Sequence, residues 1–163
     1  MKSFDQTHKI LIAVEDSTYS QRATSYGIDL AKKLSAEIAL LHVNELPVAT
    51  SYSTDPLMAE PPIMMPEMIH VQEDSSKKLL NKIADSIGDD TTIYTFHKTG
   101  NPKDEILSTA EEWGADMIIL GTHGRTGFDH FLSGSVAEKV VRKAKCPVLI
   151  IPNKEKEEHS NSN

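Results

Sequence analysis

The chain has 163 residues, of which 39% are hydrophobic and 25% charged, and its formal net charge is −7. This length suits one domain with a single core, and no apolar run approaches the roughly 20 residues that span a bilayer. The N-terminal segment MKSFDQTHK has no apolar signal core, and the negative charge opposes binding to phosphate backbones. We therefore expect a cytoplasmic globular domain that binds neither a membrane nor a nucleic acid.

Five short apolar runs predict β-strands. Four of them are nearly continuous, which is typical of strands covered on both faces of a sheet. The third run alternates between polar and apolar residues and is rich in Thr, so we expect it at a sheet edge. In chain order the runs are Lys9 to Val14, Glu37 to Val43, Thr91 to His97, Asp116 to Gly121 and Pro147 to Pro152.

Helical patterns separate these runs. The first helix has Asp16 or Ser17 as its N-cap, and the second ends at Gly88. The third begins with an Asn101 cap and ends at Gly114, and the fourth runs from about Gly134 to Lys143. Their expected apolar stripes are Ala23, Tyr26, Gly27, Leu30, Ala31 and Leu34; Met68, Leu79, Leu80, Ile83, Ala84 and Ile87; Ile106, Ala110 and Trp113; and Ala137, Val140, Val141 and Ala144.

Strands that alternate with helices predict an α/β domain, with right-handed crossovers and a parallel sheet covered by helices on both faces. We expect one domain over residues 1–152. Residues 45–66 hold five of the eight prolines and three of the six methionines, and we interpret them as a flexible insertion, with a flap over a ligand as the alternative. Residues 153–163 are expected to be a disordered tail.

Three further residues are assigned to packing rather than chemistry. Cys146 is the only cysteine, so it can form neither an internal disulfide nor a cysteine-rich zinc cluster. Trp113 occupies an apolar position at a helix end. His42 lies within a buried strand, where a hydrogen-bonded core histidine is more common than a ligand or a catalyst.

The stretch GTHGRTGFDHFLSGS, residues 121–135, lies between a buried strand and a helix, where open α/β sheets bind ligands. Its glycines allow close backbone approach, so the amides around Gly121, Gly124 and Gly127 can surround an anion. Gly134 and Ser135 add amides of a helix start. The stretch therefore predicts a phosphate site. Neither a Walker A motif nor a GxGxxG fingerprint occurs in the chain.

The spacing of Gly121, Gly124 and Gly134-Ser135 follows the pattern G-x2-G-x9-G-[S/T], in which the chain resembles the ATP-binding universal stress proteins. The resemblance covers about residues 8 to 152, including a first strand that ends in an acidic-x-Ser turn, a second that ends in LHV, and a closing CPVLIIP. The family usually has Asp-Gly-Ser at the first turn, where this chain has Glu15-Asp16-Ser17.

The resemblance implies a Rossmann-like, open five-stranded parallel sheet of order 3-2-1-4-5 that binds ATP or AMP, with or without Mg²⁺. It places adenine between the ends of the first two strands and ribose and phosphates on the glycine stretch. It also implies a homodimer that pairs through the last strand, Val148 to Ile151, which would otherwise be a bare edge. The implied nucleotide-binding residues are Ala13, Val14, Glu15, Val43, Leu120, Gly121, Gly124, Gly134, Ser135 and Val136. We add Arg125 from its chemistry, because its planar guanidinium suits a phosphate.

Simpler interpretations stand beside several of these assignments. Ser135 begins a capping box with Glu138, which explains the serine without a ligand. Arg125 suits a phosphate but equally a solvated position. His123, Asp129 and His130 are close in sequence, yet their spacing is no known metal pattern, so we assign neither a metal site nor catalytic residues.

We expect a nucleotide-binding stress-response regulator in which ATP or AMP changes the surface offered to partners. A slow ATP hydrolase or phosphotransferase is the first alternative; Glu15, Asp16 or His123 would have to act as its base. The second is a dimeric interaction module that binds no nucleotide.

Overall fold

The computed structural model describes residues 6–45, 66–122 and 136–152. Its elements alternate along the chain as predicted. They are β1 (Lys9–Val14), α1 (Thr18–Leu34), β2 (Glu37–Asn44), α2 (Pro66–Ile87), β3 (Ile93–Thr99), α3 (Pro102–Trp113), β4 (Met117–Gly121), α4 (Val136–Lys143) and β5 (Val148–Ile151).

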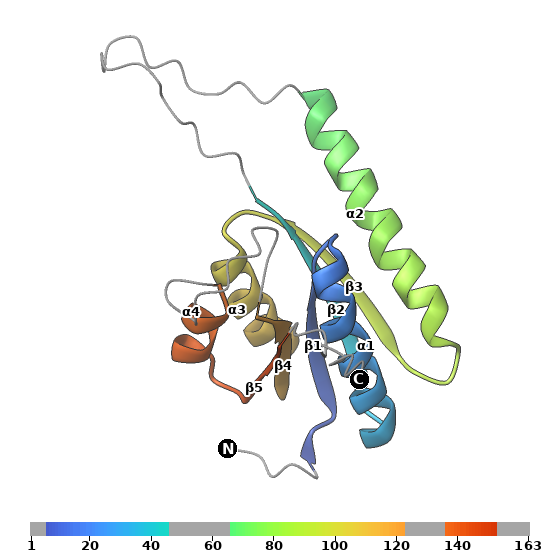
Figure 1. Ribbon diagram of the computed structural model, residues 1–163, viewed down its shortest axis with the longest axis vertical. Coiled ribbons are helices and arrows are strands. Elements are labelled where there is room, and N and C mark those ends of the chain that lie inside the picture. Colours follow the sequence, from blue (N-terminus) through green and yellow to red (C-terminus); the bar gives the residue numbers. More distant parts are fainter. Residues whose placement is uncertain (1–5, 46–65, 123–135, 153–163) are drawn as a thin grey trace, which may run out of the picture.

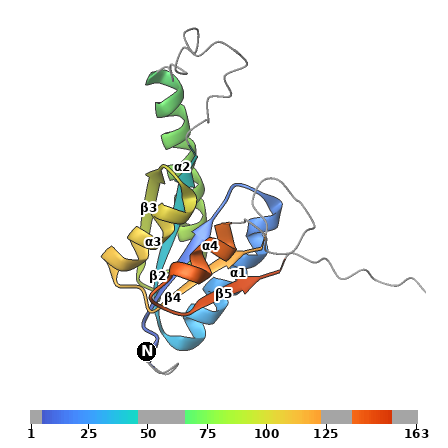
Figure 2. The same ribbon diagram turned by 90° about the vertical axis from the view of Figure 1, so that its left-hand side faces the viewer.

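The strands form one five-stranded sheet in the order β3-β2-β1-β4-β5, and every pairing is parallel. This confirms the α/β fold and the sheet order that the resemblance implied, as well as the edge position of the third strand (Figure 1). Because all strands run the same way, their carboxyl ends share one edge of the sheet. Helices α1 and α2 cover one face, and α3 and α4 cover the other (Figures 1 and 2).

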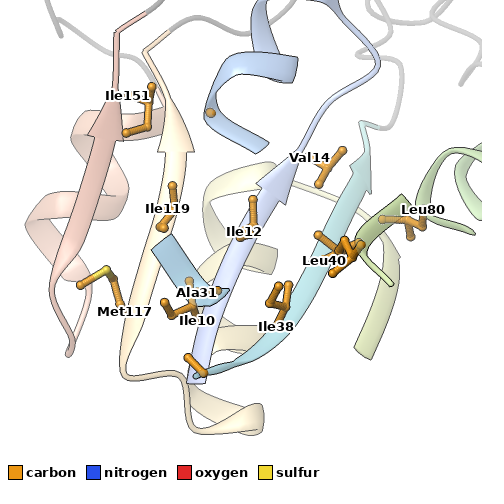
Figure 3. Packing of buried hydrophobic residues seen from close by; sticks show 13 residues of the cluster. Ile10, Ile12, Val14, Ala31, Ile38, Leu40, Leu80, Met117, Ile119 and Ile151 are labelled. Atoms are coloured by element: carbon orange, nitrogen blue, oxygen red, sulfur yellow. The ribbon is translucent and has the colours of Figure 1, made fainter. Parts of the chain in front are cut away.

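Each face of the sheet has its own hydrophobic layer, because successive side chains of a strand point to opposite faces. Beneath α1 and α2 lie Ile10 and Ile12 of β1 with Ile38 and Leu40 of β2, all fully buried (Figure 3). The other layer, beneath α3 and α4, is built from Leu11, Ala39, Leu41, Ile118, Leu120, Ile106, Ala110, Ala137 and Val140. The continuous apolar runs thus come from strands buried on both sides.

The predicted helix signals are present where they can be tested. Ser17, rather than Asp16, is the N-cap of α1, and its side chain accepts a hydrogen bond from the Ser20 amide. Asn101 caps α3, and Gly114 ends it in the left-handed conformation with φ 75°. Pro66, which we predict to belong to the insertion, is instead the first residue of α2. Glu45 is described, whereas residues 46–65 of the predicted insertion and the tail 153–163 lie outside the described residues.

Three residues predicted to face the core are instead exposed: Tyr26 by 52%, Met68 by 56% and Val141 by 48%. Tyr26 and Val141 lie outside the narrow side of their helices that contacts the sheet, which is occupied by Ala23 and Ala31 in α1. Met68 belongs to the first turns of α2, which extend beyond the strand ends (Figures 1 and 2). The helices are confirmed, but the prediction that these three residues face the core is wrong.

Candidate functional site

A cavity of about 700 Å³ opens at the carboxyl edge of the sheet, in the size range of small-molecule sites. The ends of β1, β2 and β4 form its floor, and residues of α2, α3 and α4 form its walls. This is the position at which open α/β sheets bind ligands, because the chain leaves neighbouring strands here toward opposite faces.

Every predicted nucleotide-binding residue that the structure describes lines this cavity. Those residues are Ala13, Val14, Glu15, Val43, Leu120, Gly121 and Val136. Gly124, Arg125, Gly134 and Ser135 lie outside the described residues, as do His123, Asp129 and His130. The structure therefore brings together parts of the candidate site that are more than 100 residues apart in the sequence, while contact with a nucleotide stays a prediction.

The turn from β1 into α1 is fixed by serine hydroxyls. The Ser20 side chain accepts a hydrogen bond from the Glu15 amide at 2.9 Å, and the Ser20 amide donates to the Ser17 side chain at 3.2 Å. Glu15 is half-buried and its Oε2 atom is buried, whereas Asp16 is exposed. Both residues line the cavity, so the acidic turn that follows β1 contributes two carboxylates to its wall.

His42 holds the ends of β1 and β2 together. Its Nδ1 atom lies 2.8 Å from the Val14 carbonyl oxygen, and the residue is only 6% exposed. Because a carbonyl oxygen can only accept, Nδ1 carries the proton that is donated in this bond. His42 therefore has the structural bond expected of a core histidine, and it also borders the cavity.

Helix α2 forms a wall of the cavity that the sequence did not predict. Val71, Gln72, Ser75, Ser76 and Leu79 line it. They recur at three- and four-residue steps, so they share one side of the helix. That spacing was visible in the sequence, but nothing in the sequence showed that this side of α2 meets the ends of β1 and β2.

A hydrogen-bonded pair fastens this wall to the last residue of β2. The Asn44 amide donates to Ser76 Oγ at 2.9 Å, and Ser76 is 2% exposed. The single hydroxyl proton of Ser76 goes either to the Gln72 carbonyl oxygen at 2.8 Å or to Asn44 Oδ1 at 3.1 Å. The bond holds α2 in position beside the cavity.

The described cavity wall is acidic rather than basic. It includes the carboxylates of Glu15, Asp16 and Glu45, and no Lys or Arg among the residues that the structure describes there. Val136 and Ala137, at the start of α4, bring the positive end of that helix to the cavity. Among the described residues, the start of α4 is thus the part of the cavity wall that favours an anionic group.

Two further features lie away from this edge. A smaller cavity of about 360 Å³ lies at the opposite end of the sheet, near Lys32, Glu37 and Asp90; it is remote from the carboxyl ends of the strands. Trp113 packs edge-on against Tyr94 with ring centroids 5.7 Å apart, and the Lys9 ammonium lies 5.2 Å from the Trp113 ring.

Within the described ranges, no three His, Cys, Asp or Glu side chains gather as a metal site.

The fold and the cavity define a class: doubly wound parallel α/β domains with a cavity at the carboxyl edge of the sheet. The sequence profile of the universal stress protein family matches residues 6–152. The chain belongs to the universal stress protein family. Among its described helices, none combines the length and the apolar character needed to cross a membrane.

Relatives and solved structures agree with this assignment. Universal stress protein MJ0531 of Methanocaldococcus jannaschii is 32% identical over 155 residues, which cover 91% of this chain and 84% of the relative. Universal stress protein YxiE of Bacillus subtilis is 30% identical over 145 residues, covering 88% and 98%. The solved structure of MJ0577, a protein of unknown function when its structure was used to assign one, is 26% identical with a TM-score of 0.68, covering 91% and 98%.

Proposed function

We propose that this protein is a cytoplasmic stress-response regulator that binds an adenine nucleotide, AMP or ATP, in the cavity at the carboxyl edge of its sheet. One observation carries the proposal: the described residues of the predicted nucleotide site come from four separate elements and converge on one cavity. If the glycine pattern were a chance resemblance, the residues that it implies in β1, β2 and α4 would not be expected to lie together.

The chemistry of the cavity suits the two ends of a nucleotide. Val14, Val43 and Leu120 offer apolar surface for the faces of a base. The start of α4 and the glycine stretch before it, including Gly124, Arg125, Gly134 and Ser135, would hold the phosphates through amides. If the ligand is ATP, the Glu15 and Asp16 carboxylates are of the oxygen type that Mg²⁺ prefers.

Two further structures add support at the level of the fold. A universal stress protein solved in complex with cAMP is 21% identical with a TM-score of 0.59. Another, from Archaeoglobus fulgidus and in complex with dAMP, is 21% identical with a TM-score of 0.58. At this identity the likeness shows the fold alone, and the adenine nucleotides bound by these two proteins support the proposal for this chain.

Regulation would follow from binding. A ligand that prefers one arrangement of the cavity walls shifts the population toward it and so changes the surface offered to a partner. We propose that the protein acts in this way as a homodimer paired through β5, and that it needs no catalytic step.

The test is to purify the protein without added nucleotide, to identify any ligand released on denaturation, and to titrate AMP, ATP and cAMP by calorimetry. Ala13→Leu places a larger side chain in the cavity and should weaken binding by roughly tenfold or more. Thr92→Leu, in the smaller cavity at the other end of the sheet, is the matched control and should bind as the wild type does.

Absence of binding in the wild-type protein, or unchanged binding in Ala13→Leu, would contradict the proposal. The Gly124→Val variant tests the phosphate part separately, because a side chain at that glycine would block close approach of the backbone. Phosphate release, measured in the same samples with Mg²⁺ present, distinguishes a regulator from a slow hydrolase; a Glu15→Gln variant without turnover would identify the base.

A further inference from the structure

The α2 wall contains a carboxamide that the proposed function does not use. Gln72 is half-buried and lines the cavity. Its backbone carbonyl oxygen lies 2.8 Å from the Ser76 hydroxyl and can accept a hydrogen bond from it. Its side-chain amide makes no hydrogen bond with the described part of the chain. A carboxamide at a cavity wall carries two donors and two acceptor lone pairs, and it gains most when a ligand satisfies them.

The backbone that carries Gln72 is held firmly. One turn farther along α2, Ser76 is bonded to Asn44 at the end of β2 and is 2% exposed. The next turn places Leu80, also 2% exposed, in the core between α2 and the sheet (Figure 3). The anchored helix fixes the backbone of Gln72 and so limits the space that its side-chain amide can reach.

Gln72 lies beside the position that we propose for the base. Helix α2 runs from the carboxyl edge of the sheet back to the start of β3, so its N-terminal turns stand above the strand ends (Figures 1 and 2). Gln72 is one turn N-terminal to the residue bonded to Asn44, so it lies beyond the last residue of β2. The ends of β1 and β2 are the floor on which the adenine is proposed to lie.

We propose that Gln72 recognises the adenine base of the bound nucleotide through its N6/N7 edge and is the residue that selects adenine over guanine or hypoxanthine. The carboxamide oxygen accepts from the N6 amino group while the amide N–H donates to N7, a bidentate pairing that glutamine makes with adenine. Guanine and hypoxanthine carry an O6 acceptor beside N7, so the same carboxamide satisfies one bond and leaves its oxygen unpaired. This inference rests on the proposed function.

The test compares three ligands on matched proteins by calorimetry: AMP, IMP, which has lost the N6 donor, and 7-deaza-AMP, which has lost the N7 acceptor. Wild-type protein should bind AMP on the order of tenfold more tightly than either analogue. Gln72→Met keeps the length of the side chain and removes the amide, so it should weaken AMP to the level of IMP and leave IMP and 7-deaza-AMP nearly unchanged. Asn81→Met, on an exposed position of α2, is the control.

The outcomes separate the inference from the proposed function. If wild-type protein binds AMP but Gln72→Met weakens all three ligands equally, or none of them, Gln72 does not read the base, and nucleotide binding itself stands. If the wild-type protein binds no nucleotide, both are wrong. Circular dichroism and the melting temperature of each variant show that a loss of selectivity comes from the amide and not from unfolding.

Discussion

At the scale of single residues, some side chains at the carboxyl edge both line the cavity and connect two elements of the fold. His42 and Ser76 each line the cavity and hold two elements together. A sequence shows that such residues are polar and lie in apolar surroundings, but it does not show their partners. The interpretation of His42 as a structural residue was confirmed by its bond to the Val14 carbonyl, whereas the pairing of Asn44 with Ser76 was missed.

Replacing His42 by Phe should destabilise the protein by about 1–3 kcal/mol, because the buried Val14 carbonyl loses its hydrogen bond with the His42 ring. Urea unfolding followed by circular dichroism measures the change. His97→Phe is the matched control: His97 is the partner of His42 on β3 and is less buried, so its replacement should cost much less. Equal losses in the two variants would show that the bond contributes nothing particular.

The Cys146 thiol should react slowly. Burial raises its pKa above the ordinary value of 9.0, and the Asp116 carboxylate raises it further. Since the thiolate is the reactive form, folded protein should react with DTNB more slowly at pH 8 than unfolded protein does, and Asp116→Asn should speed the reaction. A native rate equal to the rate in guanidinium would contradict this.

The same shift of pKa has a consequence for stability. A thiol whose pKa is higher in the folded state contributes its full stabilisation below the pKa of the unfolded thiol. It loses that contribution as the pH rises through the pKa of the folded thiol. The free energy of unfolding should therefore fall above about pH 9 more steeply in the wild type than in Cys146→Ser.

At the scale of elements, the sequence identified which segments are helices but not how closely each helix approaches the sheet. In α1 that approach depends on Gly27, where a Cβ atom would lie 2.9 Å from Ile12 Cδ1 and 3.4 Å from Ile119 Cδ1. Both isoleucines are fully buried, so they have little room to move.

Gly27→Ala should therefore destabilise the protein by about 1–2 kcal/mol. Overpacking of a core costs about 1–3 kcal/mol, and the better helix propensity of alanine recovers up to about 1 kcal/mol of it. Denaturant unfolding measures the difference, with Ser25→Ala on an exposed position of the same helix expected to be neutral or slightly stabilising. A stabilised Gly27→Ala protein would mean that α1 can move away from β1 and β4 without cost.

At the scale of the whole molecule, the strand and helix pattern was sufficient for an α/β fold with a parallel sheet, because buried strands separated by amphipathic helices allow few other arrangements. The order of the strands came from the glycine pattern that begins at Gly121 and its family resemblance, not from periodicity. The site was predicted only where a residue lies in such a motif. Gln72 and Asn44 were missed because the side of α2 that meets β2 is decided by packing between distant segments.

Strand β5 is an edge strand of the described sheet, and this leads to a prediction about assembly. The Pro147 carbonyl oxygen accepts a hydrogen bond from the Ile118 amide of β4, and the Ile151 carbonyl oxygen accepts one from the Thr122 amide, directly after β4 ends. Because the peptide groups of a strand alternate in direction, those of Val148 and Ile150 therefore point away from it. Antiparallel pairing of two β5 strands across a two-fold axis would use these outward groups and cover an edge that would otherwise invite aggregation.

Ile150→Pro removes one outward N–H without touching the bonds to β4, and proline is tolerated at edge positions of this kind. If the protein is a dimer through β5, the wild type should run at twice the monomer mass in light scattering and Ile150→Pro as a monomer. Ile150→Ala loses the side chain but keeps the N–H, so it should remain dimeric and separates the backbone pairing from side-chain packing. A dimeric Ile150→Pro protein would place the interface elsewhere, and a monomeric wild type would mean that the β5 edge stays unpaired in solution.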